Sequence, residues 1–236
     1  MNKFSSTFLY RFLYLAFSLP LLCNAQITDM TIFKAKPTSK FYQEEFQRIG
    51  AYKVKGNSWI LKGNNETDLY SAFGFSPDVA IVYDTYTQSI GILQDSRVDQ
   101  IKLDNVEVDS FIVKADKDLN FSQPAFFINA EKFDGTKKGF LQRLTNGTKY
   151  NLYKSFKAEM RPAAMDLAQT NVKEFEIVSE YYYLDMKDKT TFIKIKPNTK
   201  ALKDFFKDQK LALELLENES QKLEPRLISF FNKVNE

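Results

Sequence analysis

The sequence predicts an α+β fold, in which an antiparallel sheet of β-hairpins or a meander, or else a partly open barrel, is followed by two or three C-terminal helices. From residue 51 to residue 195, short apolar segments alternate with turns rich in Gly, Asn and Asp, which is typical of strands. After Pro197 the apolar residues recur at i, i+3 and i+4, which indicates helices. We therefore expect a β-rich domain over 26–196 and a helical tail over 197–236 packed on it.

The first 25 residues have the three zones of a secretory signal peptide. Lys3 and Arg11 form a positive zone, residues 12–22 form a short apolar run, and small residues precede the bond between Ala25 and Gln26. The apolar run is too short for a membrane anchor, because a spanning helix needs about 20 residues. We therefore expect cleavage at Ala25–Gln26, no transmembrane span afterwards, and export to the periplasm or the extracellular space.

Two residue types that carry much enzyme chemistry are nearly or wholly missing. Cys23 is the only cysteine and lies inside the leader, and the chain has no histidine. Ser-His-Asp catalysis, Cys-His catalysis and zinc sites built on His or Cys are therefore excluded. Lipoprotein processing at Cys23 is the less favoured alternative to cleavage, because Leu22 stands where a small residue is required.

Composition and charge are those of an ordinary globular protein. Hydrophobic residues make up 44% and charged residues 27%, and the 22 Phe and 12 Tyr can build a large core without disulfides. The formal net charge is +3, and two of the positive charges belong to the leader. A nearly neutral chain has no basic footprint for nucleic acid, so no nucleic-acid partner is expected.

Several strands are predicted between residues 51 and 113. Tyr52 and Val54 alternate with lysines, and a turn at 55–57 joins them to Trp59–Leu61 as a hairpin. A second turn is predicted at 62–65. The remaining predicted strands are 79–83, which pairs with 89–93, and then 101–103, 106–108 and 111–113.

A hairpin over 140–154 has the strongest turn signal, because Asn146-Gly147 is the favoured dipeptide of a two-residue type I′ loop. Such a loop fixes the register of the two strands. The predicted cross-strand pairs are Thr145 with Thr148, Arg143 with Tyr150, and Leu141 with Leu152.

The strand Phe175–Met186 is apolar on both faces, which predicts burial on both sides, and a turn at 187–189 leads into a returning strand at 191–195. Three helices follow. The first is capped by Asn198 or Thr199, and Pro225 stands in the first turn of the third. Their apolar stripes are Leu202, Phe205 and Phe206, then Leu211, Leu215 and Leu216, then Leu227, Phe230, Phe231 and Val234.

Few residues stand out as chemical sites. Asp116, Asp118 and Asn120 alternate like calcium ligands, but Phe121 and Phe127 occupy the positions where an EF-hand loop needs Gly and Glu. An acidic loop between strands is the better interpretation. The chain has no glycine-rich nucleotide motif, and we predict no cofactor, metal or catalytic residue. The 30 Asp and Glu leave a carboxylate pair for glycan hydrolysis open.

Three further features favour ordinary structural roles. Tyr181–Tyr183 and Trp59 could line a sugar or peptide groove, but aromatic residues at strand spacing are more often core. Residues 187–210 contain eight lysines and three aspartates, which favours a solvated face over a site for anionic polymers. Glycosylation sequons occur by chance in an Asn-rich chain; they start at Asn65, Asn120, Asn146 and Asn218.

Four local sequences resemble a group of exported, uncharacterised proteins of the Bacteroidetes lineage, which has no assigned activity. The resemblance would cover roughly residues 45–236, and it implies export to a bacterial envelope without supplying any site residue. The sequences that carry it are Val82-Tyr83-Asp84, residues 156–163, Tyr182-Tyr183-Leu184 and residues 201–210.

These observations lead to one expected function and one alternative. We expect an exported, non-enzymatic binding or interaction protein of the envelope or periplasm, whose partner is an envelope protein or a glycan. The alternative is a carboxylate-dependent glycan hydrolase. A cleft with two facing carboxylates would favour the hydrolase, and a groove without such a pair would favour binding.

Overall fold

The computed structural model describes residues 46–93, 100–115, 123–135, 137–163, 172–188, 191–196, 199–208, 210–217 and 221–236, and all of them belong to one compact unit. The predicted leader, its cleavage site at Ala25–Gln26 and the acidic loop at 116–120 lie outside the described residues. They therefore stay predictions.

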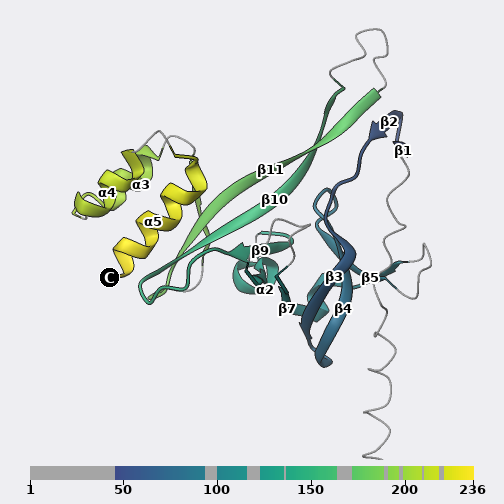
Figure 1. The fold of residues 1–236 in the computed structure, drawn as a ribbon, viewed down its shortest axis with the longest axis horizontal. Helices are drawn as coiled ribbons and strands as arrows, with labels where there is room; N and C mark the ends of the chain where they lie inside the picture. The colour runs from purple at the N-terminus through teal and green to yellow at the C-terminus, as the bar shows by residue number, and fades with distance from the viewer. Residues whose placement is uncertain are drawn as a thin grey trace, which may run out of the picture. The chain divides into compact units, whose positions relative to one another are not determined.

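The described strands form one open, mixed sheet of twelve strands, in the order β1-β2-β11-β10-β9-β8-β7-β3-β4-β5-β6, with β12 paired to β11 (Figure 1). Two meanders, β3 to β6 and β7 to β11, are joined by antiparallel pairing of β3 with β7. The one parallel pair in this order is β2 with β11. The strands are β1 (Phe46–Ile49), β2 (Tyr52–Lys55), β3 (Trp59–Ser71), β4 (Gly74–Asp84), β5 (Ser89–Leu93), β6 (Gln100–Lys102), β7 (Val108–Val113), β8 (Ala125–Asn129), β9 (Phe140–Arg143), β10 (Tyr150–Pro162), β11 (Val172–Asp185) and β12 (Ile193–Ile195).

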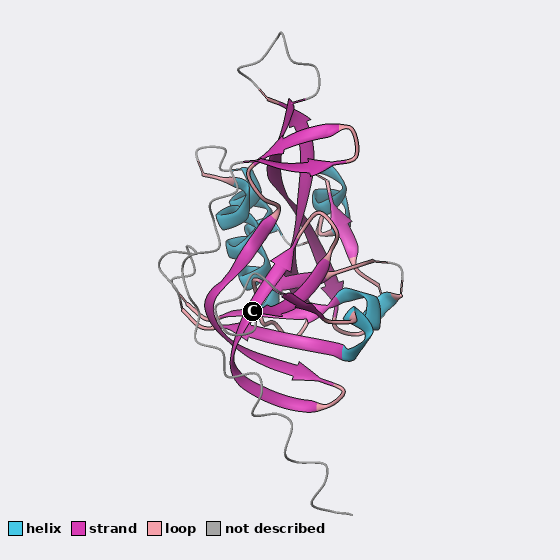
Figure 2. Ribbon diagram, turned by 90° about the vertical axis from the view of Figure 1, so that its right-hand side faces the viewer, coloured by secondary structure: helices cyan, strands magenta, loops and turns pink. Residues whose placement is uncertain are grey.

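Helices are few beside the strands (Figure 2), and most of them follow the last strand, as the sequence predicts. The change from strands to helices falls between the end of β12 at Ile195 and the start of α3 at Lys200. Within the described part of the chain, no helix has the length and apolarity needed to cross a membrane. The helices are α2 (Ala130–Asp134), α3 (Lys200–Phe205), α4 (Lys210–Glu217) and α5 (Leu223–Asn235), with a 3-10 turn, η2 (Asn105–Glu107), between β6 and β7. The predicted α+β fold class is thus confirmed.

The centre of the sheet is held by fully buried aromatic rings from β4, β7, β8 and β9. The rings of Phe111 and Phe127 stack at 4.6 Å, and the ring of Tyr83 stands edge-on to Phe140 at 5.7 Å. Hydrogen bonds join the turn after β4 to β10: the Ala158 N–H donates to the Thr85 carbonyl, and the Gln88 amide donates to the Phe156 carbonyl at 2.9 Å. The two meanders therefore face each other across this aromatic core.

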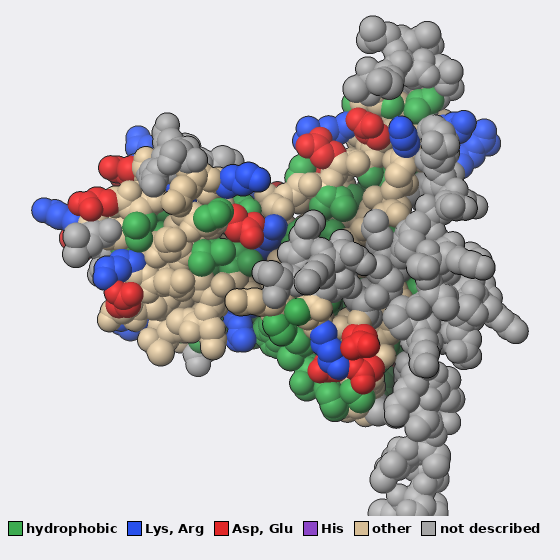
Figure 3. Space-filling view, in the orientation of Figure 1, with side chains coloured by type: hydrophobic (Ala, Val, Ile, Leu, Met, Phe, Trp, Pro, Cys, Tyr) green, Lys and Arg blue, Asp and Glu red, His purple; other side chains and the backbone are tan. Residues whose placement is uncertain are grey.

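The helical tail packs on the end of β10 and β11 nearest to residues 150 and 185 (Figure 1). The predicted stripe of α5 is buried there, and its phenylalanines Phe230 and Phe231 contact Phe206 and Tyr183. On its outer surface, basic and acidic side chains are interspersed (Figure 3), and Lys203 pairs with Glu217 at 3.1 Å. Thr199 is the N-cap residue of α3 and is one of the two residues predicted for this position, but its φ is positive and its side chain makes no cap hydrogen bond with the described residues.

The predicted hairpin between Tyr52–Val54 and Trp59–Leu61 is wrong. β2 pairs with β1 and with β11, whereas β3 pairs with β4 and β7. The predicted turn at 62–65 is also wrong, since β3 runs through it as a β-bulge in which Gly63 takes a φ of +76°. A glycine that signals a turn in sequence can equally supply the positive φ of a bulge inside a strand.

The hairpin over 140–154 is confirmed, but its register is wrong. β9 and β10 pair Arg143 with Tyr153 and Leu141 with Ser155, so the connection is longer than the two-residue loop that was predicted. Neither Asn146 nor Gly147 is among the described residues with a positive φ. The Asn-Gly dipeptide therefore does not form a type I′ turn here.

Two of the other strand predictions are confirmed, and two need correction. The predicted strand at 106–108 is largely the 3-10 turn η2, whose Val106 N–H is accepted by the Asp104 carboxylate at 3.0 Å. The predicted strand at 175–186 is confirmed within β11, and the predicted pairing of 79–83 with 89–93 is confirmed as β4 with β5. Burial on both faces of β11 holds for Tyr182, Tyr183 and Leu184, but its other half is partly exposed.

Candidate ligand-binding cleft

A cleft with a volume of 390 Å³ lies where the outer face of β4, β5 and β6 meets β11 and β1. This volume falls within the range of small-ligand sites, about 300–1,000 Å³. We call it the aromatic cleft. Its described lining residues are Ile49, Ser58, Trp59, Val82, Asp84, Tyr86, Thr87, Ser89, Ile90, Gly91, Lys102 and Phe175.

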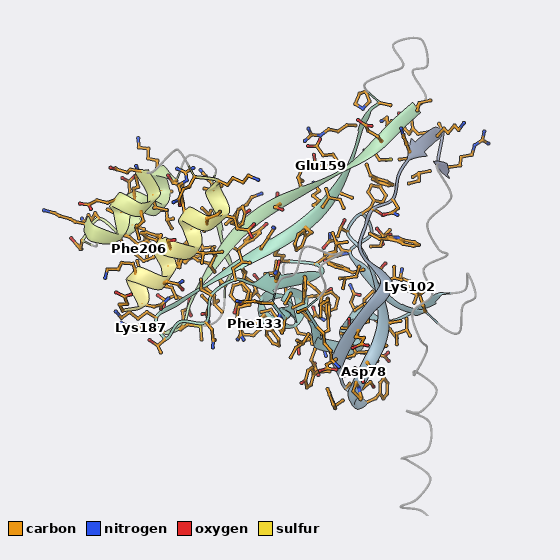
Figure 4. The ribbon with its side chains drawn as sticks, in the orientation of Figure 1. Asp78, Lys102, Phe133, Glu159, Lys187 and Phe206 are labelled. Carbon is orange, nitrogen blue, oxygen red and sulfur yellow. The ribbon has the colours of Figure 1, made fainter. Side chains whose placement is uncertain are left out.

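Strand register sets the floor of the cleft. Val82 pairs with Gly91, which in turn pairs with Lys102, so these three residues form one row across β4, β5 and β6. Neighbouring residues on a strand point to opposite faces, and the adjacent pair of Ile81 with Ile92 accordingly lies in the buried core. Lys102 ends the row at the edge strand β6 (Figure 4), where its side chain is exposed.

Three aromatic side chains line the cleft, and they come from separate parts of the chain. Trp59 begins β3 and packs partly buried against Ala80, Val82 and Leu93. Tyr86 lies in the turn after β4 and is 40% exposed, and its ring contacts Phe175 of β11 at 5.3 Å with an interplanar angle of 60°. Tyr86 belongs to the first meander and Phe175 to the second. This part of the cleft wall therefore depends on the packing of the two meanders against each other.

Asp84 is the one carboxylate among the described residues of the cleft lining, and it holds the turn that presents Tyr86. Its oxygens accept hydrogen bonds from the Ser58 hydroxyl, from the Tyr86 N–H at 2.9 Å and from the Thr87 hydroxyl at 2.8 Å. Each of the two carboxylate oxygens thus has at least one donor from the protein. Asp84 is therefore a positioning residue for the aromatic wall.

A more polar hollow of 470 Å³ lies beside the aromatic cleft and shares Thr87, Ser89 and Lys102 with it. Within the described part of the chain, the buried side-chain oxygen of Asn105 has no hydrogen-bond partner, while its amide donates to the Gln88 carbonyl at 2.7 Å. The other described lining residues of this polar hollow are Gln88, Leu103, Asp104, Val106, Glu131 and Lys138.

The aromatic residues that the sequence singles out have separate fates. Tyr182 and Tyr183 are buried in the core, as favoured, and the Tyr181 hydroxyl donates to Glu224 at 2.7 Å. Burial and the neighbouring carboxylate raise the pKa of Tyr181 well above its usual value. Trp59 is the member of the set that reaches a cleft, so a groove role is supported for Trp59 and not for the tyrosines.

Tyr86 and Phe175 were missed as cleft residues, because no local pattern joins them. Tyr86 lies in a predicted turn and Phe175 in a predicted strand, and only the tertiary fold brings their rings together. In the described part of the chain, no group of three or more His, Cys, Asp or Glu side chains is placed to hold a metal ion.

The cleft offers aromatic faces for stacking and hydroxyl and ammonium groups for hydrogen bonds. These groups can hold a ligand by ring contacts and hydrogen bonds. No protein-family model, curated protein or solved structure matches this chain. The expected resemblance to exported Bacteroidetes proteins therefore stays a prediction.

Proposed function

We propose that this chain is an exported, non-enzymatic binding protein of the bacterial envelope or periplasm, and that its ligand occupies the aromatic cleft. The observation that carries the proposal is that Trp59, Tyr86 and Phe175 line one cleft, the aromatic cleft, whose volume suits a small ligand. Export rests on the predicted signal peptide at the start of the chain.

A neutral glycan segment is the ligand class that this lining favours. Aromatic rings contact the apolar face of a sugar ring, and polar groups at the rim meet its hydroxyls. Thr87 donates its hydroxyl proton to Asp84, so Ser89 donates to Thr87 at 2.7 Å, and the two hydroxyl oxygens are left as acceptors for sugar hydroxyls. Lys102 supplies a donor at the exposed edge. Asp84 is already engaged by donors of the protein, so the cleft does not call for a cationic ligand.

Trp59 makes the proposal directly testable, because it is the only tryptophan of the chain and lies in the cleft. Titration with chito-oligosaccharides and malto-oligosaccharides should change its fluorescence in a saturable way. Apolar and aromatic tripeptides form the second arm of the titration. Binding of tripeptides in place of both glycan series would overturn the glycan assignment, and no saturable change with any probe would overturn the cleft as the binding site.

Matched variants locate the binding. Phe175→Ala and Tyr86→Ala should each weaken the fluorescence-detected affinity by about ten-fold or more, as expected for aromatic anchors. Phe133→Ala is the control, because Phe133 is a partly exposed aromatic residue outside the cleft lining (Figure 4). Equal weakening in the control would contradict a specific role of the cleft.

Glycan hydrolysis remains the second candidate function, and one observation favours it: the polar hollow is lined by two carboxylates, Asp104 and Glu131. Glycosidases of the usual type need such a pair. Release of reducing ends from the same oligosaccharides would support hydrolysis if both Asp104→Asn and Glu131→Gln abolished it. Binding without release in the unaltered chain would exclude hydrolysis of those glycans.

A further inference from the structure

The turn between β3 and β4 carries three exposed aromatic side chains, far from the aromatic cleft along both strands. Phe73 is 70% exposed, Phe75 49% and Tyr70 37%, and the rings of Tyr70 and Phe75 contact each other at 5.0 Å. We call Tyr70, Phe73 and Phe75 the aromatic tip. Exposed aromatic side chains that lie together on the surface are candidates for a site of interaction with proteins or membranes.

The aromatic tip lies in a stretch without charge. Residues 69–77 contain no Asp, Glu, Lys or Arg, and this stretch ends at Asp68 on one side and Asp78 on the other. Val106 is also exposed, and its neighbour Glu107 accepts a hydrogen bond from the Ala72 N–H of the turn at 2.8 Å. The hairpin turn is thus hydrogen-bonded to the 3-10 turn η2.

The backbone of the turn is hydrogen-bonded within the protein. The Phe73 N–H donates to the Ser71 hydroxyl at 3.2 Å, and that hydroxyl donates to the Gly74 carbonyl at 3.2 Å. Ser71 also pairs with Gly74 at the end of the β3–β4 ladder. A segment that leaves water for a lipid environment needs its polar backbone groups satisfied in this way.

Charged side chains lie behind the tip and are paired with one another. Lys114, which directly follows β7, forms ion pairs with both Asp78 and Asp68, the latter at 3.6 Å. Figure 3 shows hydrophobic side chains at this end of the hairpin beside a small group of charged ones, and Figure 4 marks Asp78. The aromatic tip is thus apolar, and the charged residues Asp68, Asp78 and Lys114 lie next to it. The same order, apolar groups and then polar groups, is found where a protein meets a membrane surface, and Tyr and other aromatic side chains are enriched there.

From these observations we propose that the aromatic tip inserts into the headgroup region of an electrically neutral lipid surface. A hairpin end is convex and enters a lipid layer without needing a complementary pocket, whereas protein hot spots are usually anchors in well-packed pockets. The acidic residues that flank the tip, Asp68 and Asp78, give no reason to expect anionic lipids to bind more strongly. This inference is independent of the proposed ligand of the aromatic cleft.

Vesicle flotation tests the proposal. The chain is purified after export and mixed with vesicles of phosphatidylcholine alone, or with vesicles that also contain phosphatidylglycerol. We expect it to float with both, with little effect of added salt. The double variant Phe73→Ser/Phe75→Ser should lower the bound fraction by about ten-fold or more, since two phenyl rings no longer leave water. Phe205→Ser is the matched control, because Phe205 is equally apolar and 56% exposed on the helical tail.

Any apolar leader residues that remain after export are shared by the tip and control variants, so a difference between them reports the tip alone. A label at Ala72→Cys, in a Cys23→Ser background, gives a second measurement: an environment-sensitive fluorophore there should shift to the blue with phosphatidylcholine vesicles. Equal flotation of the two variants, or no blue shift, would overturn the proposal. So would sedimentation showing that the unaltered chain self-associates and the tip variant does not, since the occupant would then be a second copy.

Discussion

The side chain of Asn235, next to the end of the chain, clasps the backbone of Tyr150 at the start of β10. Its oxygen accepts from the N–H groups of Lys149 and Tyr150, both at 2.9 Å, and its amide donates to the carbonyls of Tyr150 and Phe231 at 2.8 and 2.7 Å. Residues that are distant in sequence are thus joined by one amide side chain. The clasp fixes the last turn of α5 against the hairpin.

We predict that Asn235→Ala lowers the free energy of unfolding by about 1–3 kcal/mol, because it removes four hydrogen bonds and leaves partly buried backbone groups without a protein partner. Urea denaturation followed by circular dichroism measures the change. Asn232→Ala, an exposed asparagine on the same helix, should change stability by less than about 0.5 kcal/mol. Similar losses in the two variants would show that the clasp is not stabilising.

Gly147 is required for the clasp by space and not by backbone conformation. Its φ is not positive, yet a methyl group added there would collide with the side chain of Asn235. We predict that Gly147→Ala costs about 1–3 kcal/mol in the unaltered chain and markedly less in an Asn235→Ala background. A double-mutant cycle by urea denaturation measures this coupling, and simple additivity of the two losses would contradict it.

The clasp also explains why the hairpin was predicted with the wrong register. Turn chemistry at Asn146-Gly147 predicts a two-residue loop, but the Lys149 and Tyr150 N–H groups donate to Asn235 and not across the hairpin. The existence of the hairpin follows from local pattern, whereas the Tyr150 N–H at the start of β10 bonds to a side chain 85 residues further along the chain. The buried stripe of α5 was predicted correctly from its helical spacing. The same spacing was not sufficient in the two shorter helices, where the predicted stripe residues Phe205 and Leu215 are 56% and 37% exposed.

The candidate site shows the same division. Trp59 could be singled out from the sequence, but the other aromatic residues of the cleft could not. The local pattern does not place Phe175 there; it lines the cleft because of the order of the strands in the sheet. The parallel pairing of β2 with β11 joins residues that no hairpin rule connects, and the hairpin predicted for β2 was wrong for that reason. Gly63 misled in another way, since its positive φ serves a bulge and not a turn.

Gly63 and Gly56 allow the two costs of adding a methyl group to be separated. Both have a φ of +76°, but a methyl at Gly63 would collide with the Leu93 side chain, while a methyl at Gly56 would meet no described atom within 4 Å beyond its chain neighbours. We predict that Gly56→Ala costs about 1–2 kcal/mol from backbone strain, and that Gly63→Ala costs about 1–3 kcal/mol more from overpacking. Urea midpoints compare the two, and equal losses would show that β3 relaxes away from Leu93.

Tyr83 should stabilise the fold through its hydrogen bonds, and its contribution should depend on pH because the buried phenol resists ionisation. Its buried hydroxyl accepts from the Phe140 N–H at 3.1 Å and donates to the Gln88 side-chain oxygen at 2.8 Å. Tyr83→Phe removes the partner of the buried Phe140 N–H and of the partly buried Gln88 oxygen, so we expect the free energy of unfolding to fall by about 1–3 kcal/mol at neutral pH. Tyr70→Phe, which removes an exposed hydroxyl, is the control.

The pH dependence of that loss is a separate prediction. Burial raises the pKa of Tyr83 well above its ordinary value of 10.0, because the phenolate would lose its water. The neutral phenol therefore stabilises the fold fully below about pH 10, and this contribution falls as the pH rises further and the unfolded chain releases its proton.

Five other tyrosines with raised pKa values will also weaken the fold in alkali, namely Tyr150, Tyr153, Tyr181, Tyr182 and Tyr183. The difference in stability between the unaltered chain and Tyr83→Phe should consequently narrow above about pH 10 in urea titrations. A difference that stayed constant across that range would mean that Tyr83 ionises as easily in the folded chain as in the unfolded one.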